Sequence, residues 1–262
     1  MVDSVNLSSG LYWQTIGDGK DIVLLHGWGM NGAVWQQTAE KLSKSFRVHI
    51  VDLPGYGHSH HVEAQNLDSI CELLLLQAPK QAIWMGWSLG GLIASHIAIH
   101  HPSRVEKLIT VSSSPKFAAE KPWRGIQPKV LQNFTQQLLE DFKVTVERFM
   151  ALQAMGSPTA KSDLKQLKKS VLTRPEPNTD ALLYGLSLLA DVDQRNQLQS
   201  LTLPILRLYG RLDGLVPIKV ASDLQELLPD SPYFVFLQSS HAPFMTELDD
   251  FCEQVTEFSL SA

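Results

Sequence analysis

Short apolar and β-branched runs alternate along the chain with longer stretches in which apolar residues recur every three or four positions. Ile22–Leu25 and Ile83–Met85 are continuously apolar, which is typical of strands covered on both faces. The alternation predicts an α/β fold, with a doubly wound, mostly parallel sheet between helices. Strands are expected at Leu11–Thr15, Asp21–Leu25, Arg47–Asp52, Ala82–Gly86, Lys107–Ser112, Ile205–Tyr209 and Phe234–Leu237. Helices are expected at Ala33–Ser43, Leu67–Gln77, Leu89–His100, Ile218–Leu228 and Asp249–Phe258.

The alternation breaks late in the chain, where the pattern is helical and contains no convincing strand. Apolar residues recur at helical steps from Leu131 onward, a second helix follows Pro158, and a third begins near Asn178 or Thr179, either of which could cap it. We interpret this insertion as a helical cap over the carboxyl ends of the strands, where such sheets bind ligands. The alternative is that these helices only extend the core. We predict one catalytic unit built from three segments of the chain. They are the first part of the core at 1–115, the cap at 116–190 and the second part of the core at 191–262.

Composition and charge exclude several classes of protein. With 44% hydrophobic and 19% charged residues the chain is ordinary for a globular protein, and it has no apolar run long enough for a transmembrane helix. Its net charge of −5 argues against nucleic-acid binding, and residues 1–6 lack the features of a signal peptide. Cys71 and Cys252 are too few for a disulfide framework and lack metal-site spacing, so we expect buried free thiols in a reducing cytosol. We therefore expect a cytoplasmic protein that binds neither membranes nor nucleic acids.

The sharpest local motif is Gly86-Trp87-Ser88-Leu89-Gly90-Gly91. It directly follows a predicted strand and directly precedes a predicted helix, which is the setting of a nucleophile elbow. Glycines suit this turn because a Cβ would collide with neighbouring backbone. We predict Ser88 as a nucleophile, with a plain turn serine as the alternative.

A serine nucleophile needs a base to take its proton and a third group to orient that base. Hydrolases built on this elbow place serine, acid and histidine in that chain order, which favours His241, just after the last predicted strand. Asp213 follows the strand Ile205–Tyr209 and is the predicted acid, with Asp191 and Asp193 as rivals at the end of the insertion. The histidines expected to have structural or surface roles are His26, His49, His58, His60, His61, His96, His100 and His101.

Acyl transfer also needs two N–H donors for the oxyanion that develops on the carbonyl. The amide of Leu89 is one expected donor, because it follows the nucleophile at the start of a helix. The amide of Trp28 is the other, because Gly27 and Gly29 let this backbone approach a substrate.

These motifs carry a resemblance along essentially the whole chain. In order they are HGWG at His26, DLPGYGHS at Asp52, GWSLGG at Gly86, GRLDGLVP at Gly210 and SHAPF at Ser240. The chain resembles the α/β-hydrolase family. More narrowly it is similar to the biotin-pathway carboxylesterases that hydrolyse pimeloyl-acyl-carrier-protein methyl ester. Stretches that carry the closer similarity are Leu24–Gly29, Ala82–Gly91, Thr145–Phe149 and Leu206–Gly210.

The resemblance implies a serine carboxylesterase that uses no metal or cofactor and releases methanol. The acyl-carrier protein that bears the substrate would be its partner, and we expect a monomer. Substrate-binding residues implied by the resemblance are Trp28, Ser88, Leu89, Phe149, Met150, Ala151, Leu152, Gln153 and His241. Trp28, Leu89, Phe149, Leu152 and Met155 would line an acyl channel, although as apolar residues they could equally be core packing.

Charge is distributed unevenly between the cap and the rest of the chain. Residues 116–174 hold 11 Lys and Arg against 5 Asp and Glu, whereas the remainder holds 11 against 22. A basic face of Lys161, Lys165, Lys168 and Lys169 on one cap helix fits an acidic carrier, although a solvated surface is the alternative. The resemblance implies carrier docking at Arg148, Lys161 and Lys165, and Val144 stands where the family has a further basic residue.

Two other functions fit the same residues. A broad-specificity short-chain carboxylesterase or a carbon–carbon bond hydrolase would share the triad and fold, and an assay of Ser88-dependent methanol release against cleavage of a vinylogous diketone separates them. A non-catalytic ligand receptor could also use this fold, since fold does not fix function, and it would not react with a fluorophosphonate.

Overall fold

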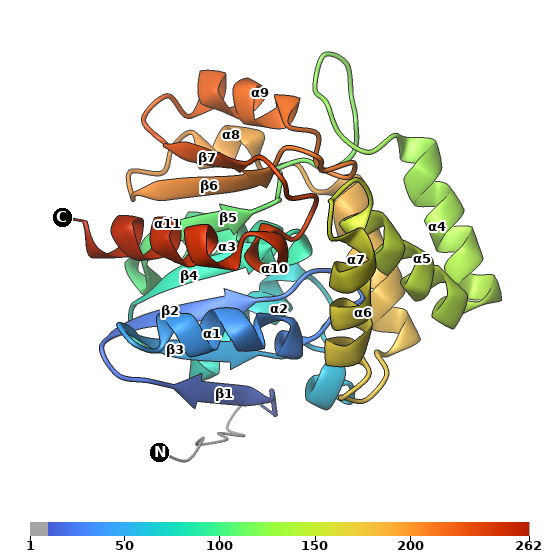
Figure 1. Cartoon of the computed structure of the whole chain (residues 1–262), viewed down its shortest axis with the longest axis horizontal. Helices are drawn as coiled ribbons and strands as arrows, with labels where there is room; N and C mark the ends of the chain where they lie inside the picture. The colour runs from blue at the N-terminus through green and yellow to red at the C-terminus, as the bar shows by residue number, and fades with distance from the viewer. Residues whose placement is uncertain (1–9, 262) are drawn as a thin grey trace.

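A seven-stranded sheet runs through the protein in the order β1-β3-β2-β4-β5-β6-β7 (Figure 1). The structure, a computed structural model, describes residues 10–261, so residues 1–6, where no signal peptide is expected, lie outside the described part. Only β1 is antiparallel to its neighbour, which confirms the predicted doubly wound, mostly parallel sheet. The strands are β1 (Trp13–Ile16), β2 (Lys20–Leu25), β3 (Phe46–Val51), β4 (Ala82–Trp87), β5 (Val105–Val111), β6 (Ile205–Gly210) and β7 (Tyr233–Phe236).

Helices cover both faces of this sheet. In Figure 1, α1 (Gln36–Leu42) and α11 (Leu248–Leu260) lie in front of it, while α2 (Leu67–Gln77) and α3 (Leu89–His100) lie behind it. The remaining elements outside the cap are η1 (Gly32–Trp35), η2 (Gly57–Ser59), η3 (Pro102–Arg104), α8 (Arg195–Leu198), α9 (Lys219–Leu227) and α10 (Pro243–Thr246). The helices α2, α3, α9 and α11 match their predicted positions within two residues, whereas α1 begins three residues later than predicted because Gly32–Trp35 forms the separate 3-10 helix η1. The helices α8 and α10 were not predicted because four residues carry no periodicity.

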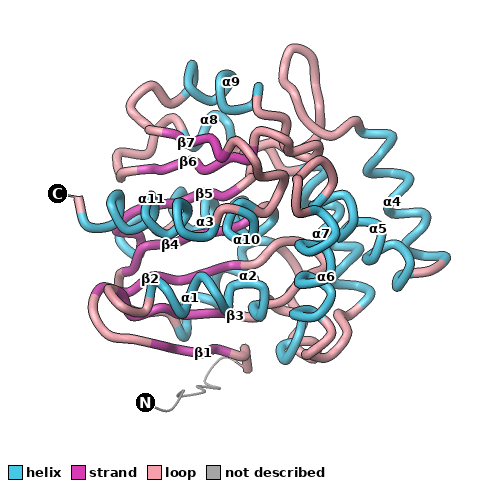
Figure 2. The backbone as a smooth tube through the Cα atoms, viewed as in Figure 1, coloured by secondary structure: helices cyan, strands magenta, loops and turns pink. Residues whose placement is uncertain are grey.

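The continuously apolar strands form the centre of the core. Every residue of β4 and the last four residues of β2 are buried, as expected for strands enclosed by helices (Figure 2). Each such large apolar side chain contributes about 1.5–3 kcal/mol by its burial. This rigid centre ends at the turns that carry the polar residues of the site.

Between β5 and β6 the chain leaves the sheet and forms the cap, defined here as α4 (Pro128–Glu140), α5 (Phe142–Ala154), α6 (Ala160–Val171) and α7 (Thr179–Asp191). Figure 1 shows these helices beyond the arrowheads of the parallel strands. The apolar pattern from Leu131 is split into two helices because the Asp141 side chain accepts a hydrogen bond from Val144 N and caps α5. Asn178 caps α7, one of the two predicted caps. The segment boundaries after residues 115 and 190 stay a prediction.

A buried ion pair ties the cap to the core. Arg174 Nη1 donates to Asp52 Oδ1, and the two side chains are 7% and 0% exposed. The same carboxylate accepts hydrogen bonds from the backbone of Gly32 and His58, each at 2.7 Å. The Arg174 guanidinium also lies 4.7 Å from the centre of the Tyr12 ring. These contacts fix the chain between α6 and α7 above the loop that follows β3.

Two further features concern the chain as a whole. Cys71 and Cys252 are free and buried. In the part of the chain that the structure describes, no helix is both long and apolar enough to span a bilayer.

Candidate active site

Ser88 occupies a strained turn between β4 and α3. Its φ of 54° and ψ of −117° lie where residues other than glycine are uncommon. The turn is held by a hydrogen bond from Ser88 N to Val111 O at 2.9 Å and one from Ser113 Oγ to Ser88 O at 2.8 Å. This backbone has the geometry of a nucleophile elbow.

The glycines around Ser88 are required by close backbone approach. A Cβ on Gly86 would lie 2.1 Å from Gly90 O, and a Cβ on Gly90 would lie 2.4 Å from Leu25 O. On Gly91 it would lie 2.5 Å from Ser113 Cβ. The collision with neighbouring backbone that the motif predicts is therefore present at Gly86 and Gly90.

His241 and Asp213 form a buried pair at the ends of neighbouring strands β6 and β7. The His241 Nδ1 to Asp213 Oδ2 distance is 2.7 Å, and the side chains are 0% and 1% exposed. Asp213 Oδ1 accepts from the backbone N–H groups of Leu215 and Val216 at 2.8 and 2.9 Å. One carboxylate oxygen is thus fixed by the turn, and the other orients the imidazole.

The rival carboxylates are used elsewhere. Asp193 is paired with Arg195 and Lys116, and these contacts lower its pKa to about 2. Asp191 is exposed at the end of α7. Of the candidate acids, Asp213 is the one that the structure places against His241.

The other nitrogen of His241 faces no partner. Its Nε2 atom is buried and makes no hydrogen bond to any group of residues 10–261. The Ser88 hydroxyl is therefore not bonded to it. The loops of the two residues are nevertheless joined, since Trp87, beside Ser88, donates its indole N–H to His241 O at 2.7 Å. Serine–base hydrogen bonds are often long in free enzymes and tighten only with substrate. A base with a free nitrogen is what proton transfer from Ser88 needs.

The loop after β2 lies beside the nucleophile turn, because β2 and β4 pair directly and Leu25 stands opposite Gly86. A Cβ on Gly27 would lie 3.3 Å from Ser88 Cβ. Trp28 is fully buried and donates its indole N–H to Leu182 O at 2.8 Å, which fixes the loop. Leu89 is the first residue of α3, so its N–H has no carbonyl within the helix to bind. The amides of Trp28 and Leu89 could therefore bind an oxyanion.

His26 supports this loop and is not a second base. Its Nδ1 faces Gly27 O at 2.9 Å, and its Nε2 accepts from Leu53 N at 3.0 Å, so the partners define a neutral ring. Burial lowers the pKa of His26 to about 4. The predicted structural role of His26 is confirmed.

The residues expected to bind substrate fall into two groups. The Trp28 and Phe149 rings meet edge to face with centroids 4.7 Å apart, and Met150 and Gln153 are buried beside them. Ala151 and Met155 are exposed on the cap and Leu152 is half-buried. Leu89 is also buried, and the backbone carbonyl oxygen of Gln153 accepts a hydrogen bond from His241 N at 3.0 Å.

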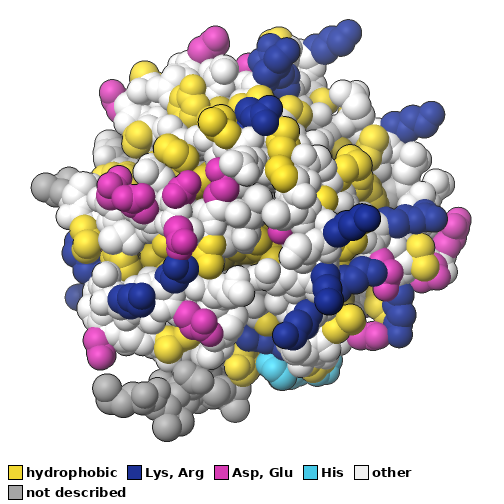
Figure 3. Space-filling model, viewed as in Figure 1, with side chains coloured by type: hydrophobic (Ala, Val, Ile, Leu, Met, Phe, Trp, Pro, Cys, Tyr) yellow, Lys and Arg dark blue, Asp and Glu magenta, His cyan; other side chains and the backbone are white. Residues whose placement is uncertain are grey.

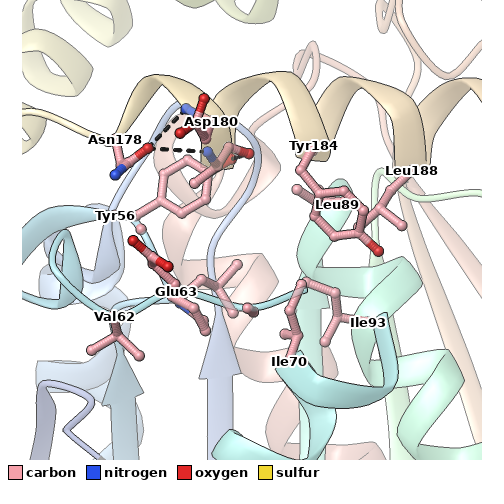
Figure 4. Close-up of a pocket in the computed structure, with 16 residues that line it drawn as sticks. Tyr56, Val62, Glu63, Ile70, Leu89, Ile93, Asn178, Asp180, Tyr184 and Leu188 are labelled. Carbon is pink, nitrogen blue, oxygen red and sulfur yellow. Dashed lines mark hydrogen bonds between the residues drawn. The ribbon is translucent and has the colours of Figure 1, made fainter. Parts of the chain in front are cut away.

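A cavity of about 250 Å³ lies on the Leu89 side of the site, between α2, α3, α7 and the loop after β3 (Figure 4). Its inner wall is apolar, and Glu63 and Asp180 are exposed at its outer end. Residues labelled in the figure are Tyr56, Val62, Glu63, Ile70, Leu89, Ile93, Asn178, Asp180, Tyr184 and Leu188. The sequence did not predict this cavity, although the loop motif DLPGYGHS leads into it.

The basic residues expected to dock a carrier lie on the surface of the cap. Arg148, Lys161 and Lys165 are exposed on α5 and α6, where Lys and Arg side chains gather in Figure 3. Within residues 10–261, neither Lys161 nor Lys165 has a carboxylate partner. Lys168, on the same helix, is paired with Glu147 at 2.9 Å.

Comparisons with known proteins agree with this geometry. Residues 21–248 match the family model described as alpha/beta hydrolase fold. The pimeloyl-[acyl-carrier protein] methyl ester esterases of Vibrio campbellii and Vibrio cholerae are 68% and 63% identical over 253 residues, which cover 97% of this chain and 100% and 99% of theirs. An esterase from Exiguobacterium antarcticum superposes with a TM-score of 0.83 at 23% identity, with 96% of each chain covered. A bromoperoxidase from Bacillus anthracis superposes with a TM-score of 0.86 at 18% identity, with 99% of this chain and 100% of that chain covered. The chain therefore belongs to the alpha/beta hydrolase family, in the group of these Vibrio esterases.

Proposed function

We propose that this chain is a serine carboxylesterase that hydrolyses the methyl ester of pimeloyl-acyl-carrier protein to pimeloyl-acyl-carrier protein and methanol, a step of biotin synthesis. The relatives at 63–68% identity bear the name of this activity. The observation that carries the proposal is the 2.7 Å contact between His241 Nδ1 and Asp213 Oδ2, which leaves a free, buried Nε2 beside the Ser88 elbow.

Ser88 Oγ attacks the ester carbonyl while His241 Nε2 takes its proton. The carbonyl oxygen becomes an oxyanion, which the amides of Leu89 and Trp28 stabilise; one such donor is worth about 3–4 kcal/mol of barrier. His241 then protonates the departing methoxide, which leaves an acyl group on Ser88. A water molecule then attacks this acyl group and gives its proton to His241, which returns the proton to Ser88 Oγ as the bond from the acyl carbon to that oxygen breaks and the carboxylic acid leaves.

Asp213 stabilises the imidazolium that His241 becomes in both steps. Its Oδ1 is held by two backbone amides, so its Oδ2 keeps one direction toward Nδ1. Both side chains are buried, and a charge interaction is stronger there than in water. The fixed carboxylate also selects the imidazole tautomer in which Nε2 is free to accept a proton.

The carrier would dock on Arg148, Lys161 and Lys165. Residues 116–174, which include α4, α5 and α6 of the cap, have an excess of basic residues, whereas the rest of the chain has an excess of acidic ones. Opposite charge steers association and orients a partner. An acidic carrier protein therefore meets an attractive surface on the cap and repulsion elsewhere. We expect the enzyme to act as a monomer in the cytoplasm.

Trapping of the acyl-enzyme tests the proposal. Acid-quenched mixtures of enzyme and pimeloyl-carrier methyl ester should contain an acyl adduct on the peptide that carries Ser88, and a fluorophosphonate should label the same peptide. Ser88→Ala should abolish both signals. Ser95→Ala is the matched control, because Ser95 is another buried serine on α3. An adduct that persists in Ser88→Ala would contradict the proposal.

The cavity beside Leu89 favours a second candidate function, hydrolysis of free, uncharged medium-chain esters. His241 protonates the alcohol, so the alcohol lies on its side; the carbonyl oxygen faces the amides of Leu89 and Trp28, and the acyl chain leaves the reacting carbon in a direction away from His241. The cavity borders Leu89 and has an apolar inner wall. Glu63 and Asp180 at its outer end would repel an acyl chain that ends in a carboxylate.

Chain-length selectivity tests this second function. Ala64→Phe adds a ring at the cavity from the surface loop that carries Glu63. Activity on p-nitrophenyl octanoate should fall at least fivefold while activity on the acetate stays within about twofold. Dimethyl pimelate should be a better substrate than monomethyl pimelate, and Glu63→Gln should narrow this difference. Unchanged selectivity in both variants would exclude the cavity as an acyl site.

A further inference from the structure

Asp163 of the cap has a buried carboxylate. Among the described side chains, those that form hydrogen bonds to it all donate through hydroxyl groups. Its Oδ2 accepts hydrogen bonds from Ser157 Oγ at 2.9 Å, Thr159 Oγ1 at 2.8 Å and Thr246 Oγ1 at 3.0 Å. Ser157 and Thr159 lie in the turn between α5 and α6, so they join parts of the cap. Thr246 is the last residue of α10 in the core, so its bond crosses from core to cap.

The last turn of α5 and the residue that follows this helix also hold the loop of the proposed base. The backbone N–H of His241 donates to Gln153 O at 3.0 Å, and Ser240 Oγ donates to Met155 O at 2.9 Å. His241 is followed directly by Ala242 and then by α10. Three hydrogen bonds thus run from residues 240–246 to residues 153–163, and the catalytic histidine lies within the segment that they hold.

We infer that Asp163 is a positioning residue for His241, which it holds through Thr246 and through the turn between α5 and α6. This inference rests on the proposed role of His241. Because α10 begins two residues after His241, movement of α10 away from α6 would move the imidazole relative to Ser88. Misplacement of a catalytic group by about 1 Å can cost up to about 100-fold in rate, so a single anchoring bond is enough to matter.

The energetic reason lies in the burial of Asp163. Asp163 is 7% exposed, and a buried carboxylate must keep its hydrogen bonds. No Lys, Arg or His among the described residues forms an ion pair with it. The three hydroxyl groups therefore supply the hydrogen bonds that water would give to an exposed carboxylate. Thr246 therefore has one favoured place, against Oδ2, and α10 is fixed with it.

Two isosteric substitutions separate positioning from general support of the cap. Thr246→Val removes the hydroxyl that joins α10 to Asp163, whereas Thr159→Val removes a hydroxyl that joins Asp163 only to its own cap turn. Each variant loses one hydrogen bond to Asp163 Oδ2 and keeps the shape of the side chain, and Thr159→Val also loses the 2.9 Å contact between Thr159 Oγ1 and Ser157 Oγ within the same turn. Thr246→Ser restores the donor and serves as the rescue. Ser240→Ala removes the other side-chain bond between the histidine loop and the cap.

The readouts are kcat and KM on p-nitrophenyl acetate, the rate of labelling by a fluorophosphonate, and Tm. Thr246→Val should lower kcat and the labelling rate about tenfold with KM within twofold, and Ser240→Ala should act in the same direction. Thr159→Val and Thr246→Ser should stay within about twofold of wild type. Labelling is measured per folded molecule, so partial unfolding of a variant does not imitate the effect.

Two results would overturn the inference. Wild-type rates in Thr246→Val would show that the bond does not position His241. If Thr246→Val and Thr159→Val lowered kcat equally and also lowered Tm equally, Asp163 would only stabilise the cap and would not position His241. Failure of the wild-type protein to react with the fluorophosphonate is a different result, since it would contradict the proposed serine esterase itself.

Discussion

The backbone N–H of His241 donates to the carbonyl oxygen of Gln153, 3.0 Å away, and so joins the proposed base to the cap. On its other side, the carbonyl oxygen of His241 accepts from the indole of Trp87, next to Ser88. The histidine backbone is therefore held between the nucleophile turn and the cap. The position of this histidine therefore depends on both the cap and the turn that carries Ser88.

The triad should behave as a unit in kinetics. Ser88→Ala and His241→Ala should each lower kcat by about 10⁶, and the double variant should be scarcely worse, because neither residue works without the other. Asp213→Asn should cost about 10⁴, since the amide favours the wrong imidazole tautomer. Steady-state assays with enzyme at high concentration measure these losses. Losses that add in the double variant would contradict the assignment.

Removal of Arg174 should destabilise the protein. Arg174→Met leaves the Asp52 carboxylate buried with only backbone donors, and loss of one partner from a buried pair costs about 3–5 kcal/mol. Urea unfolding followed by circular dichroism measures the free energy of unfolding. Lys44→Met, at an exposed position, is the control. A change below 1 kcal/mol in Arg174→Met would mean that the pair does not anchor the cap.

Burial of His26 should make stability depend on pH. The folded pKa of about 4 lies below the unfolded value of about 6.5, so the unfolded chain binds the proton more readily. The contribution of His26 to the free energy of unfolding is fully present above pH 6.5. It is lost as pH falls toward 4, and the loss amounts to up to about 3 kcal/mol. Over this range the free energy of unfolding of His26→Gln should fall less steeply than that of wild type. Parallel curves from urea titrations at each pH would contradict the buried, neutral assignment.

Charge reversal on the cap should affect only the carrier-bound substrate. Replacement of Arg148, Lys161 and Lys165 by glutamate should lower kcat/KM on pimeloyl-carrier methyl ester at least tenfold, because steering by opposite charge is lost. The difference from wild type should shrink with added salt, which screens charges over about 10 Å at 0.1 M. Hydrolysis of a p-nitrophenyl ester should stay within about twofold. Equal loss on both substrates would indicate a misfolded cap, and no loss on either would make this face ordinary surface.

Reversal of Lys44 and Lys80 is the control for that charge reversal, with about four units of charge changed in place of six. Both are exposed and lie outside the cap, on the predominantly acidic part of the chain. Their replacement by glutamate should leave kcat/KM on the carrier-bound ester within about twofold.

Local patterns were enough to predict the sheet and the Ser88 turn. Continuous apolar runs identified the buried strands, and the glycines around Ser88 revealed a turn that admits no Cβ at Gly86 and Gly90. The break at Asp141 was missed because the apolar periodicity runs through it, although an aspartate that can cap a helix was the available signal.

Contacts between distant segments could not be predicted. Asp163 and Thr246 are 83 residues apart, and nothing in either local sequence indicates that they meet. The pairing of Arg174 with Asp52 has the same origin, since a single charged residue after a helix is most often solvated. The cavity beside Leu89 likewise arises where α7 folds back over α2 and α3.

The central claim is that Ser88 hydrolyses a methyl ester presented by a carrier protein. The most direct test measures methanol released from pimeloyl-carrier methyl ester and from free dimethyl pimelate, side by side, by wild type and by Ser88→Ala. We predict methanol from both substrates, a kcat/KM at least tenfold higher for the carrier-bound ester, and no enzymatic release by Ser88→Ala. Release that survives in Ser88→Ala, or a wild-type enzyme that leaves the carrier-bound ester intact, would contradict the account.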